Sequence, residues 1–402
     1  MQTQAIQTDI VISGGGVAGL TAAALFGSAG FSVLCVDPAP PITERDADGA
    51  DLRTTAFLQP SQALLERAGL WERLAPHAAD LQVMRIVDAG GPESAARAVH
   101  DFNASDISER PFGWNLPNWL LRREMVARLT ELPGVDFRPG TGTTELFTRE
   151  GSARVTLSDG TRVDARLVIA ADGRNSPMRQ AAGIGVSTRR SGQKALAFAV
   201  THPMPHDNVS TEIHRFGGPF TLVPLLDWQG LPSSAVVWMH EGPEIARLAA
   251  LPQGAFEAEM NARSCLLYGP LTLASQRTVW PIISQVARRM SGERLALVAE
   301  AAHVVPPIGA QGLNMSLGDL RVLLELAEAA PDRLGDQRML DTYHRRRHWE
   351  VQARVAGVDV LNRASMVSSQ PLRDLRQRGL DAIYALAPVR RTMMQLGLGA
   401  RG

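Results

Sequence analysis

Lysine is almost absent from this sequence of 402 residues. Of its 41 basic side chains, only Lys194 is a lysine. Because Lys194 is followed by Ala195, the sequence lacks the Gly-Lys-Ser/Thr triplet of the phosphate-binding loops that hydrolyse nucleotides. Any Schiff-base enzyme would have to use Lys194 itself. The composition therefore argues against both of these enzyme classes.

The sequence also has few cysteines and no net charge. Cys35 and Cys265 are the only cysteines, so no disulfide framework is expected, and neither belongs to a Cys-x-x-Cys zinc motif. The 41 basic residues balance 41 acidic ones, whereas nucleic-acid-binding proteins usually carry a basic excess. The histidines of the middle region have no carboxylate or cysteine at metal-ligand spacing. We expect a protein of the reducing cytosol with no nucleic-acid partner and no metal site.

Long hydrophobic runs are missing as well. No stretch reaches the ~18–20 consecutive apolar residues that a membrane span requires. Residues 1–9 are polar and have neither the basic start nor the apolar centre of a secretory signal peptide. The expected location is cytoplasmic, with attachment to a membrane surface as the closest contact with lipid.

The first forty residues do contain a clear strand–turn–helix–strand pattern. Residues 9–12 predict a buried strand, and residues 14–19 form a Gly-x-Gly-x-x-Gly turn. An alanine-rich helix is predicted over residues 20–29 and a second strand over residues 31–36. Parallel strands joined in this way need a right-handed helical crossover. The pattern therefore predicts an open α/β sheet. Further along, the sequence predicts a turn at Ser158-Asp159-Gly160 between short strands, and helices over residues 244–262, 337–363 and 371–396, the last broken or kinked near Gly379 and Pro388.

Each glycine of this turn has a physical task in binding a dinucleotide. Gly14 makes the tight turn, and Gly16 lets the backbone approach a pyrophosphate, with Ala18 beside it as a further candidate contact. Gly19 allows close packing of helix on strand, and free N–H groups at the helix start bind the anion. Asp37, at the end of the next strand, would hydrogen-bond the adenosine ribose, which favours FAD or NAD over a 2′-phosphorylated cofactor.

Two later strands favour FAD over NAD as the cofactor. Residues 166–170 lead into Asp172, and residues 295–299 lead into Glu300. Each strand thus brings an acidic residue to the C-terminal edge of the sheet, where open α/β sheets bind their ligands. A long helix then begins at Gly312, and its N-terminal dipole could stabilise negative charge on a flavin ring during reduction.

These motifs together resemble the group A flavin monooxygenases, which have the para-hydroxybenzoate hydroxylase fold, and among them the hydroxylases of ubiquinone biosynthesis. The matching segments are residues 14–19, Arg53 within residues 51–55, residues 112–115, Asp172-Gly173, residues 218–225 and residues 300–319. The resemblance runs from about residue 8 to the C-terminus.

The resemblance implies an α/β fold in which a glutathione-reductase-type FAD-binding domain is interleaved with a smaller β-sheet substrate domain, followed by C-terminal helices. The FAD-binding domain is expected in residues 1–75, 104–188 and 284–345. The substrate domain is expected in residues 76–103 and 189–283, and the helices in residues 346–402.

The resemblance also carries roles to individual residues. Arg53 is expected to contact the FAD phosphates or ribityl chain, Arg122 to touch the cofactor, and Asp172 to serve both FAD and NAD(P)H. Glu300 stands where the family has an aspartate that bonds the ribityl hydroxyls. The residues expected to border the isoalloxazine ring are Pro307, Gly312, Leu313 and Asn314. No side chain is assigned as catalytic.

Three departures from the family pattern bear on the cofactor. Ala299-Glu300 replaces the usual Gly-Asp, Ala310 replaces a glycine, and Ser316 replaces another. Glutamate is one methylene longer than aspartate and can still accept a ribityl hydrogen bond. A positive φ at Ala310 would cost roughly 1–2 kcal/mol. We expect FAD binding to survive these changes.

The activity implied by the resemblance is hydroxylation of a polyprenylated phenol in ubiquinone biosynthesis, with NAD(P)H and O2, through a C4a-hydroperoxyflavin. The implied partners are a lipophilic aromatic substrate and peripheral contact with the inner membrane or a biosynthetic complex. One alternative is a prenyl reductase or epoxidase, or a hydroxylase of a soluble aromatic acid, the latter favoured by a cation such as Arg215 in the pocket. The other is a non-catalytic FAD-binding or apo subunit, which the departures keep open.

Several conspicuous residues have ordinary structural interpretations. His303 is expected to be a packed loop histidine, and Cys265 to pack near a helix end. Residues 345–347, a run of three arginines, more often form a solvated helix face than a lipid site. Residues 380–398 are either an interfacial anchor or helix packed on its own domain. The aromatic residues on the middle strands are equally expected to line a substrate pocket or to fill a core. They are Phe198, Phe220, Trp238 and Trp280.

Overall fold

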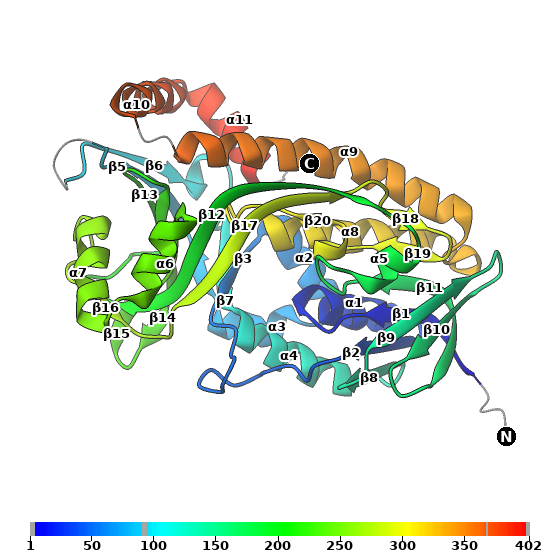
Figure 1. Ribbon diagram of the computed structural model, residues 1–402. Coiled ribbons are helices and arrows are strands. Elements are labelled where there is room, and N and C mark those ends of the chain that lie inside the picture. Colours follow the sequence, from blue (N-terminus) through cyan, green and yellow to red (C-terminus); the bar gives the residue numbers. More distant parts are fainter. Residues whose placement is uncertain (1–4, 91–94, 367–368, 399–402) are drawn as a thin grey trace.

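Three sheets and a long C-terminal helix form the frame of the molecule (Figure 1). The structure is a computed structural model and describes residues 5–90, 95–366 and 369–398. Helix α9 (Gln337–Ser365) runs along the top of both larger sheets in the view of Figure 1. The expected boundary at residue 345 therefore falls inside a continuous helix.

The strand–turn–helix–strand pattern at the N-terminus is confirmed. Strand β1 (Ile6–Ser13) leads into α1 (Val17–Ser28), which returns to β2 (Val33–Asp37). The two strands pair in parallel. Three consecutive alanines of α1 are completely buried, because the helix lies between the sheet and other helices. Their small side chains allow this close approach.

The first sheet is built outward from β1. Its further strands are β8 (Val135–Pro139), β9 (Thr143–Thr148), β10 (Ala153–Leu157), β11 (Arg162–Ala170), β18 (Ser291–Gly292) and β19 (Leu295–Leu297). The order is β18-β19-β11-β1-β2-β8, and β10 and β9 extend from β11 as a small antiparallel layer. The turn predicted at Ser158-Asp159-Gly160 joins β10 to β11.

The second sheet collects segments that are far apart in the sequence. Its strands are β5 (Val83–Asp88), β6 (Ala98–Asn103), β12 (Val186–Thr201), β13 (Val209–His214), β14 (Pro219–Trp228), β15 (Leu231–Glu241), β16 (Thr272–Leu273), β17 (Thr278–Ala287) and β20 (His303–Val304). The order is β20-β17-β12-β15-β14-β13-β5-β6, with β16 on β12. The long strands β12 and β17 curve from one part of the molecule to the other (Figure 1).

A small third sheet lies between the larger ones. It consists of β3 (Thr54–Leu58), β4 (Ala79–Leu81) and β7 (Gly113–Pro117), in the order β3-β7-β4. Both β4 and β7 contact β14 of the second sheet. β3 instead contacts α8 (Gln311–Ala329), a helix of the first layer. The small sheet therefore connects the two halves of the molecule.

The remaining helices cover these sheets. They are α2 (Gln59–Arg67), α3 (Trp71–Leu74), α4 (Asn118–Thr130), α5 (Pro177–Ala181), α6 (Gly242–Ala250), α7 (Gln253–Ser264), α10 (Gln370–Ala385) and α11 (Ala387–Leu398). Short 3-10 turns are η1 (Ala75–His77), η2 (Ala104–Asp106), η3 (Ala299–Ala301) and η4 (Pro331–Arg333). No helix among the described residues has the length and apolar character that crossing a bilayer requires.

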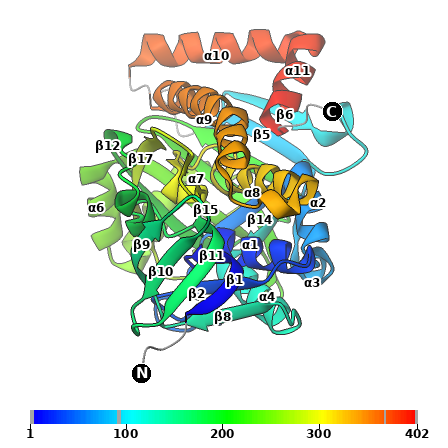
Figure 2. The ribbon, with the colours of Figure 1, turned by 90° about the vertical axis from the view of Figure 1, so that its right-hand side faces the viewer.

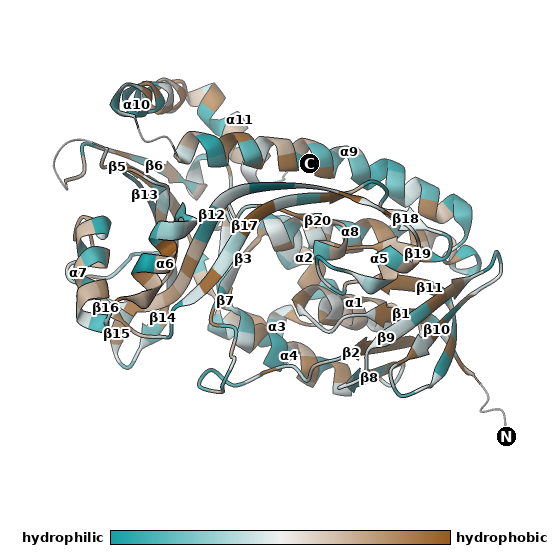
Figure 3. Ribbon diagram, in the orientation of Figure 1, coloured by the Kyte–Doolittle hydropathy of each residue, from teal (hydrophilic) through white to brown (hydrophobic). Residues whose placement is uncertain are grey.

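The largest apolar core joins the first sheet to α1, α4, α8 and α9. A second core lies between the second sheet and helices α6 and α7. In Figure 3 the first-sheet strands are largely brown where α1 covers them, whereas α9 shows mostly teal toward solvent. Burial alternates along β10 because only one of its faces is covered. The end of β11 is buried without interruption because both of its faces are covered.

Two helix predictions needed correction. The single helix expected over residues 244–262 is two helices, because the chain turns at Leu251-Pro252. The helix over residues 371–396 is broken at Leu386, close to the break expected near Pro388, whereas α10 continues through Gly379, where the other break was expected. Figures 1 and 2 both place α10 and α11 beyond α9, beside β5 and β6.

Candidate functional site

The glycine turn after β1 is too tightly packed for side chains. Gly14 has φ +107°, and a Cβ there would lie 2.4 Å from the carbonyl oxygen of Ala171. A Cβ on Gly19 would lie 1.8 Å from the carbonyl oxygen of Gly14. Both distances are shorter than any real contact. Glycine is therefore required at both positions if β1, β11 and α1 are to meet this closely.

Helix α1 begins with a bare N-terminus. Gly16 is its N-cap, no side chain accepts a hydrogen bond from the helix start, and no acidic residue lies in the first turn. A Cβ on Gly16 would meet nothing within 4 Å, so the approach to the backbone is open. Ala18, in the same turn, is buried. Free N–H groups at an open helix start form an anion site, as the sequence predicts.

Asp37 fixes the turn from the end of β2. Its Oδ2 accepts a hydrogen bond from the Gly15 N–H at 2.6 Å, and its Oδ1 accepts one from the Ala39 N–H at 2.8 Å. An ionised carboxylate has about four acceptor positions, so both oxygens can still accept hydroxyl groups. Asp37 thus joins the glycine turn to the point where a ribose would bind.

Asp172 follows β11 and carries an unsatisfied acceptor. Its Oδ2 accepts hydrogen bonds from the Ser13 hydroxyl at 3.3 Å and the Met178 N–H at 3.2 Å. Its Oδ1 is buried and has no partner. Burial raises the pKa of this carboxyl group, against the lowering effect of its hydrogen bonds. Since buried polar atoms are usually paired, an orphan of this kind marks a place where a ligand hydroxyl or amide fits.

Arg53 is held between a carboxylate and an aromatic ring. Its Nε and Nη2 donate to Asp51 at 2.8 and 2.7 Å, and its guanidinium lies 3.8 Å from the ring centroid of Trp280. Burial lowers the pKa of Arg53, but the hydrogen bonds and charge of Asp51 and the charge of Glu300 raise it overall. Arg53 therefore remains charged and faces the same space as Glu300.

Arg122 reaches the same carboxylate from α4. Its Nη2 lies 3.4 Å from Asp51 Oδ2, and the Asn118 amide donates to that oxygen at 3.1 Å. Burial alone would raise the pKa of Asp51, but its bonds to Arg53 and Asn118 and the charges of Arg53 and Arg122 hold the pKa below its ordinary value. Two arginines expected at a cofactor are thus gathered around one buried carboxylate.

Glu300 lies at the tip of the strand–loop after β19. It is exposed and sits in the 3-10 turn η3. Its neighbour Ala299 has φ +54°, in the left-handed region. The Ala299 N–H is 3.3 Å from Asp319 Oδ2, which helps to hold this turn. A glycine would adopt this conformation without strain, which explains why the departure at residue 299 matters structurally.

The loop before α8 presents an open backbone. Pro307 and Gly312 are exposed, and Leu313 is half-buried against the first core. Ala310 is the N-cap of α8 and has φ +56°. The expectation that this position could need positive φ is therefore correct. Like α1, the long helix α8 starts without a side-chain cap and with no acidic residue in its first turn.

The side chain of Asn314 is engaged in hydrogen bonds within the protein. Its amide group donates to the carbonyls of Ala56 at 2.7 Å and Ala310 at 2.6 Å, and its Oδ1 accepts from the Leu58 N–H at 2.9 Å. The side chain therefore ties α8 to β3 of the small sheet. Any contact with a flavin ring has to come from its backbone.

The aromatic residues of the middle strands separate into two groups. Phe198, Phe220 and Trp238 belong to the second core, where they pack edge-to-face with each other or with Phe256 of α7. Trp280 instead lies under Arg53, and its Nε1 is buried without a partner. Of these four residues, only Trp280 faces the candidate site.

Sequence reasoning missed Asp51, Asn118 and Asp319, and it left Trp280 open between the core and a substrate pocket. Asp51 stands two residues before Arg53, which was the available signal. His303 is packed as expected, since it is buried and lies 2.7 Å from Asp319. The expectation for the arginine run was wrong for Arg347, which is 1% exposed because it pairs with Asp319. Cys265 caps the end of α7, as expected.

The residues present fit FAD. The open glycine turn and bare helix start suit a pyrophosphate, Asp37 suits a ribose, and the unpaired Oδ1 of Asp172 suits a hydroxyl or amide donor. Among the described residues, no group of three or more metal-ligating side chains is close enough to bind an ion.

The model of the FAD binding domain family matches residues 7–358. The chain belongs to this family. Ubiquinone hydroxylase UbiL of Rhodospirillum rubrum is 33% identical over 395 residues, which cover 97% of this chain and 89% of that protein. The 3-demethoxyubiquinol 3-hydroxylase of Escherichia coli is 26% identical, with 98% of each chain covered.

Solved structures agree with the fold of this FAD-binding family. The p-nitrophenol 4-monooxygenase PnpA of Pseudomonas putida matches with a TM-score of 0.80 and 18% identity over 100% of both chains. The flavin-dependent monooxygenase PieE, solved with FAD and substrate, matches with a TM-score of 0.73 and 21% identity over 99% of this chain and 72% of that one. The expected fold class is confirmed, and the chain is an FAD-dependent monooxygenase. FAD held by these residues would supply the redox chemistry, as acceptor of a hydride from NAD(P)H and as the group that reacts with O2.

Proposed function

We propose that this monooxygenase hydroxylates the aromatic ring of a polyprenylated phenol in ubiquinone biosynthesis. The observation that carries the proposal is the 33% identity to a ubiquinone hydroxylase along almost the whole chain. A similarity of 26% to a second ubiquinone-pathway hydroxylase, again over nearly full length, supports it. The uninterrupted coverage includes both the candidate FAD site and the second sheet.

The face of the second sheet next to the loop before α8 is apolar. Ala195, Met239 and Ile282 form a buried cluster there, and Ile308 of the loop packs against it. An apolar surface beside the flavin loop suits a lipophilic substrate better than a carboxylic acid, because an unpaired carboxylate is costly to bury.

Two of the arginines that could favour a soluble aromatic acid, Arg215 and Arg53, have partners of their own. Arg215 donates to the carbonyl of Ala262 on α7 at 3.3 Å and lies over Phe216. It therefore sits on the side of the second sheet covered by helices, away from the loop before α8. Arg53 is paired with Asp51. These placements support a phenol with an apolar tail over an acid.

The proposal assigns the cofactor contacts to the residues described above. The ADP part is assigned to Gly14, Gly16, Ala18, Gly19 and Asp37, and the middle of the cofactor to Arg53, Arg122, Asp172 and Glu300. The ring is assigned to Pro307, Gly312, Leu313 and the backbone of Asn314. The domain division of residues 1–75, 104–188 and 284–345 from residues 76–103 and 189–283 is part of the same proposal, and the pairing of β5 with β13 and of β6 with β5 supports it.

The side chains of this site orient and shield, and the cofactor supplies the reactive chemistry. Arg53 and Arg122 bring positive charge toward the phosphates, while Asp51 keeps both in place. The apolar cluster around Ile308 excludes water and positions the ring to be hydroxylated.

Isotope labelling tests this proposal. Protein loaded with FAD is supplied with NADH, 18O2 and a phenol that carries a short prenyl chain, and the product is analysed by mass spectrometry. One 18O atom in the phenol product supports the proposal. Labelled product from a soluble aromatic acid but not from the prenylated phenol would favour the alternative substrate class, and NADH-reducible flavin with no labelled product would contradict hydroxylation.

A further inference from the structure

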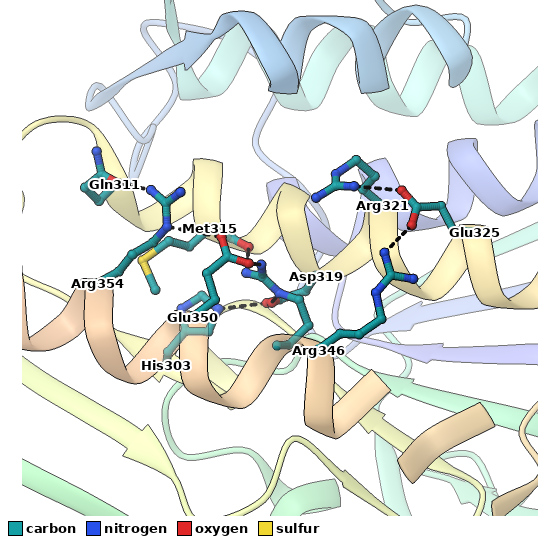
Figure 4. Close-up of polar contacts among 10 residues, drawn as sticks. His303, Gln311, Met315, Asp319, Arg321, Glu325, Arg346, Glu350 and Arg354 are labelled. Atoms are coloured by element: carbon teal, nitrogen blue, oxygen red, sulfur yellow. Dashed lines mark hydrogen bonds and ion pairs between the residues drawn. The ribbon is translucent and has the colours of Figure 1, made fainter. Parts of the chain in front are cut away.

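A buried pair of opposite charges connects α8 to α9 (Figure 4). Asp319 on α8 is completely buried, and its Oδ1 accepts a hydrogen bond from Arg347 Nε at 2.8 Å. Arg347 on α9 is equally buried and also donates from Nη2 to the carbonyl of Met315 at 3.0 Å. A charge is buried only when it is well paired, so this contact defines how the two helices meet.

Both members of the pair remain ionised at neutral pH. Burial alone would raise the pKa of Asp319, but the charges and hydrogen bonds of His303 and Arg347 hold it below the ordinary value. Burial would lower the pKa of Arg347, whereas the charges of Asp319 and Glu350 raise it. The contact is therefore a charged one with fixed geometry.

The first end of the loop of residues 303–311 is attached to this pair. His303 Nε2 lies 2.7 Å from Asp319 Oδ2, and the same oxygen accepts the Ala299 N–H at 3.3 Å. Asp319 therefore holds the strand end just before the loop. It does so only while Arg347 compensates its charge.

The second end of the loop is attached to the same helix, α9. Arg347 Nη1 pairs with Glu350, Glu350 lies 3.2 Å from Arg354, and Arg354 Nη1 donates to Gln311 Oε1 at 3.0 Å. Gln311 is the first residue of α8. Figure 4 shows these side chains in a row along the interface of the two helices.

Both attachment points adjoin strained backbone. Ala299 and Ala310 have φ of +54° and +56°. A non-glycine residue keeps such a conformation only where its surroundings fix it strongly. Asp319, paired with Arg347, provides that fixation before the loop, and Arg354 contacts Gln311 after it.

We propose that Arg347 and Arg354 are positioning residues that hold both ends of the loop 303–311, so that α9 determines where this loop meets the flavin ring. The inference rests on the assignment of this loop to the ring in the proposed function. It adds a role for α9, whose contacts with the loop are not part of the proposed function.

The test compares three variants of the full chain: Arg354→Met, Arg347→Met and Arg346→Met. Arg346 is the matched control, because it lies on the same helix but pairs with Glu325 near the surface at 2.6 Å. FAD is titrated into apoprotein to obtain its Kd, and the visible circular dichroism of the bound flavin is recorded. These readouts do not depend on turnover.

We expect Arg354→Met to raise the Kd of FAD about tenfold, as the loss of one charge-assisted hydrogen bond predicts, and to change the flavin dichroism. Arg347→Met should have a larger effect, and Arg346→Met none. Arg354→Met keeps the test valid if Arg347→Met does not fold, because its side chain is 27% exposed and its removal leaves no buried charge unpaired.

Gln311→Met alone should raise the Kd at least as much as Arg354→Met, because it removes the contact with Arg354 and also the hydrogen bond from Gln311 Nε2 to the carbonyl of Gly309 at 2.9 Å. A wild-type chain that binds FAD, with Kd and dichroism unchanged in Arg354→Met and in any folded Arg347→Met, would overturn the inference and leave the proposed function intact. A wild-type chain that binds no FAD would overturn both.

Discussion

At the scale of single residues, the site is a set of exceptions to ordinary residue preferences. Alanine occupies left-handed backbone at residues 299 and 310, where glycine is favoured. Asp172 keeps a buried oxygen without a partner, and Asp51 collects two arginines. Such exceptions cost stability, and these four lie where the chain departs from its family pattern or where the cofactor is assigned.

Ala310→Gly tests the strain at the start of α8. A left-handed alanine costs roughly 1–2 kcal/mol, and the greater freedom of glycine in the unfolded chain returns about 0.4–1 kcal/mol of that. We expect a net stabilisation of between about 0 and about 1.6 kcal/mol, measured by urea unfolding of the apoprotein. Ala353→Gly, on the exposed face of α9, is the control and should destabilise by about 1 kcal/mol. Equal losses in the two variants would contradict the strain.

Arg53→Ala tests the proposed contact with the cofactor. It removes a charge-assisted hydrogen bond of about 1.5–3 kcal/mol, so the Kd of FAD should rise by roughly one to two orders of magnitude. Circular dichroism should show a folded chain, although Asp51 loses its strongest partner. Arg67→Ala is the control, since Arg67 pairs with Glu328 on the surface. Unchanged FAD affinity in the Arg53 variant would count against the role of this arginine.

Asp172→Asn should stabilise the apoprotein in a pH-dependent way. Burial raises the pKa of Asp172, so the folded chain resists its ionisation while the unfolded chain ionises freely above about pH 4. The gain on substitution should therefore be larger at pH 7 than at pH 4, as measured by urea midpoints. Asp159→Asn is the control with the opposite sign, because hydrogen bonds from Thr161 lower the pKa of that exposed carboxyl group. A gain independent of pH would contradict the burial of charge at Asp172.

At the scale of elements, the C-terminal helices present apolar side chains to solvent. Leu372 and Leu375 of α10 are 52% and 62% exposed, and Figure 3 shows brown patches on α10 and α11. The opposite side of α10 is attached to the second sheet, where Asp374 pairs with Arg97 and Asp381 with His100. The peripheral membrane contact that the family resemblance implies would use this exposed side.

A vesicle-binding experiment tests that contact. The double variant Leu372→Glu with Leu375→Glu should bind vesicles of phosphatidylglycerol and phosphatidylcholine at least about tenfold more weakly, because two apolar side chains no longer leave water. Met204→Glu, at a site 52% exposed on another face, should bind like the wild type. Equal binding of all three forms would exclude α10 as the contact.

The sequence predicts elements well where periodicity is local and less well where distant partners decide. The unit β1-α1-β2 and the helices α8 and α9 follow from glycine spacing and helical periodicity alone. Arg347 looks like part of a solvated run, because nothing near it in the sequence reveals Asp319 on another helix. The hydrogen bond from Asn314 to β3 likewise depends on a contact between remote segments, and so does the position of Trp280 beneath Arg53.

At the scale of the whole molecule, the candidate site lies where the sheets meet. The first sheet supplies the glycine turn and Asp172, the small sheet is tied to α8 through Asn314, and the second sheet supplies Trp280 and the apolar face around Ile308. The chain crosses between the sheets several times. Binding of cofactor and substrate at this junction is therefore coupled to the packing of both halves.

The most direct test of the account is the visible absorption spectrum of the purified protein, followed by addition of NADH or NADPH in air with a prenylated phenol. The account predicts a bound-flavin spectrum that bleaches on addition of one of these reductants and returns as O2 is consumed. A protein that shows no flavin spectrum even after incubation with FAD would contradict the account. Bound flavin that neither NADH nor NADPH reduces would contradict its assignment as an NAD(P)H-dependent monooxygenase.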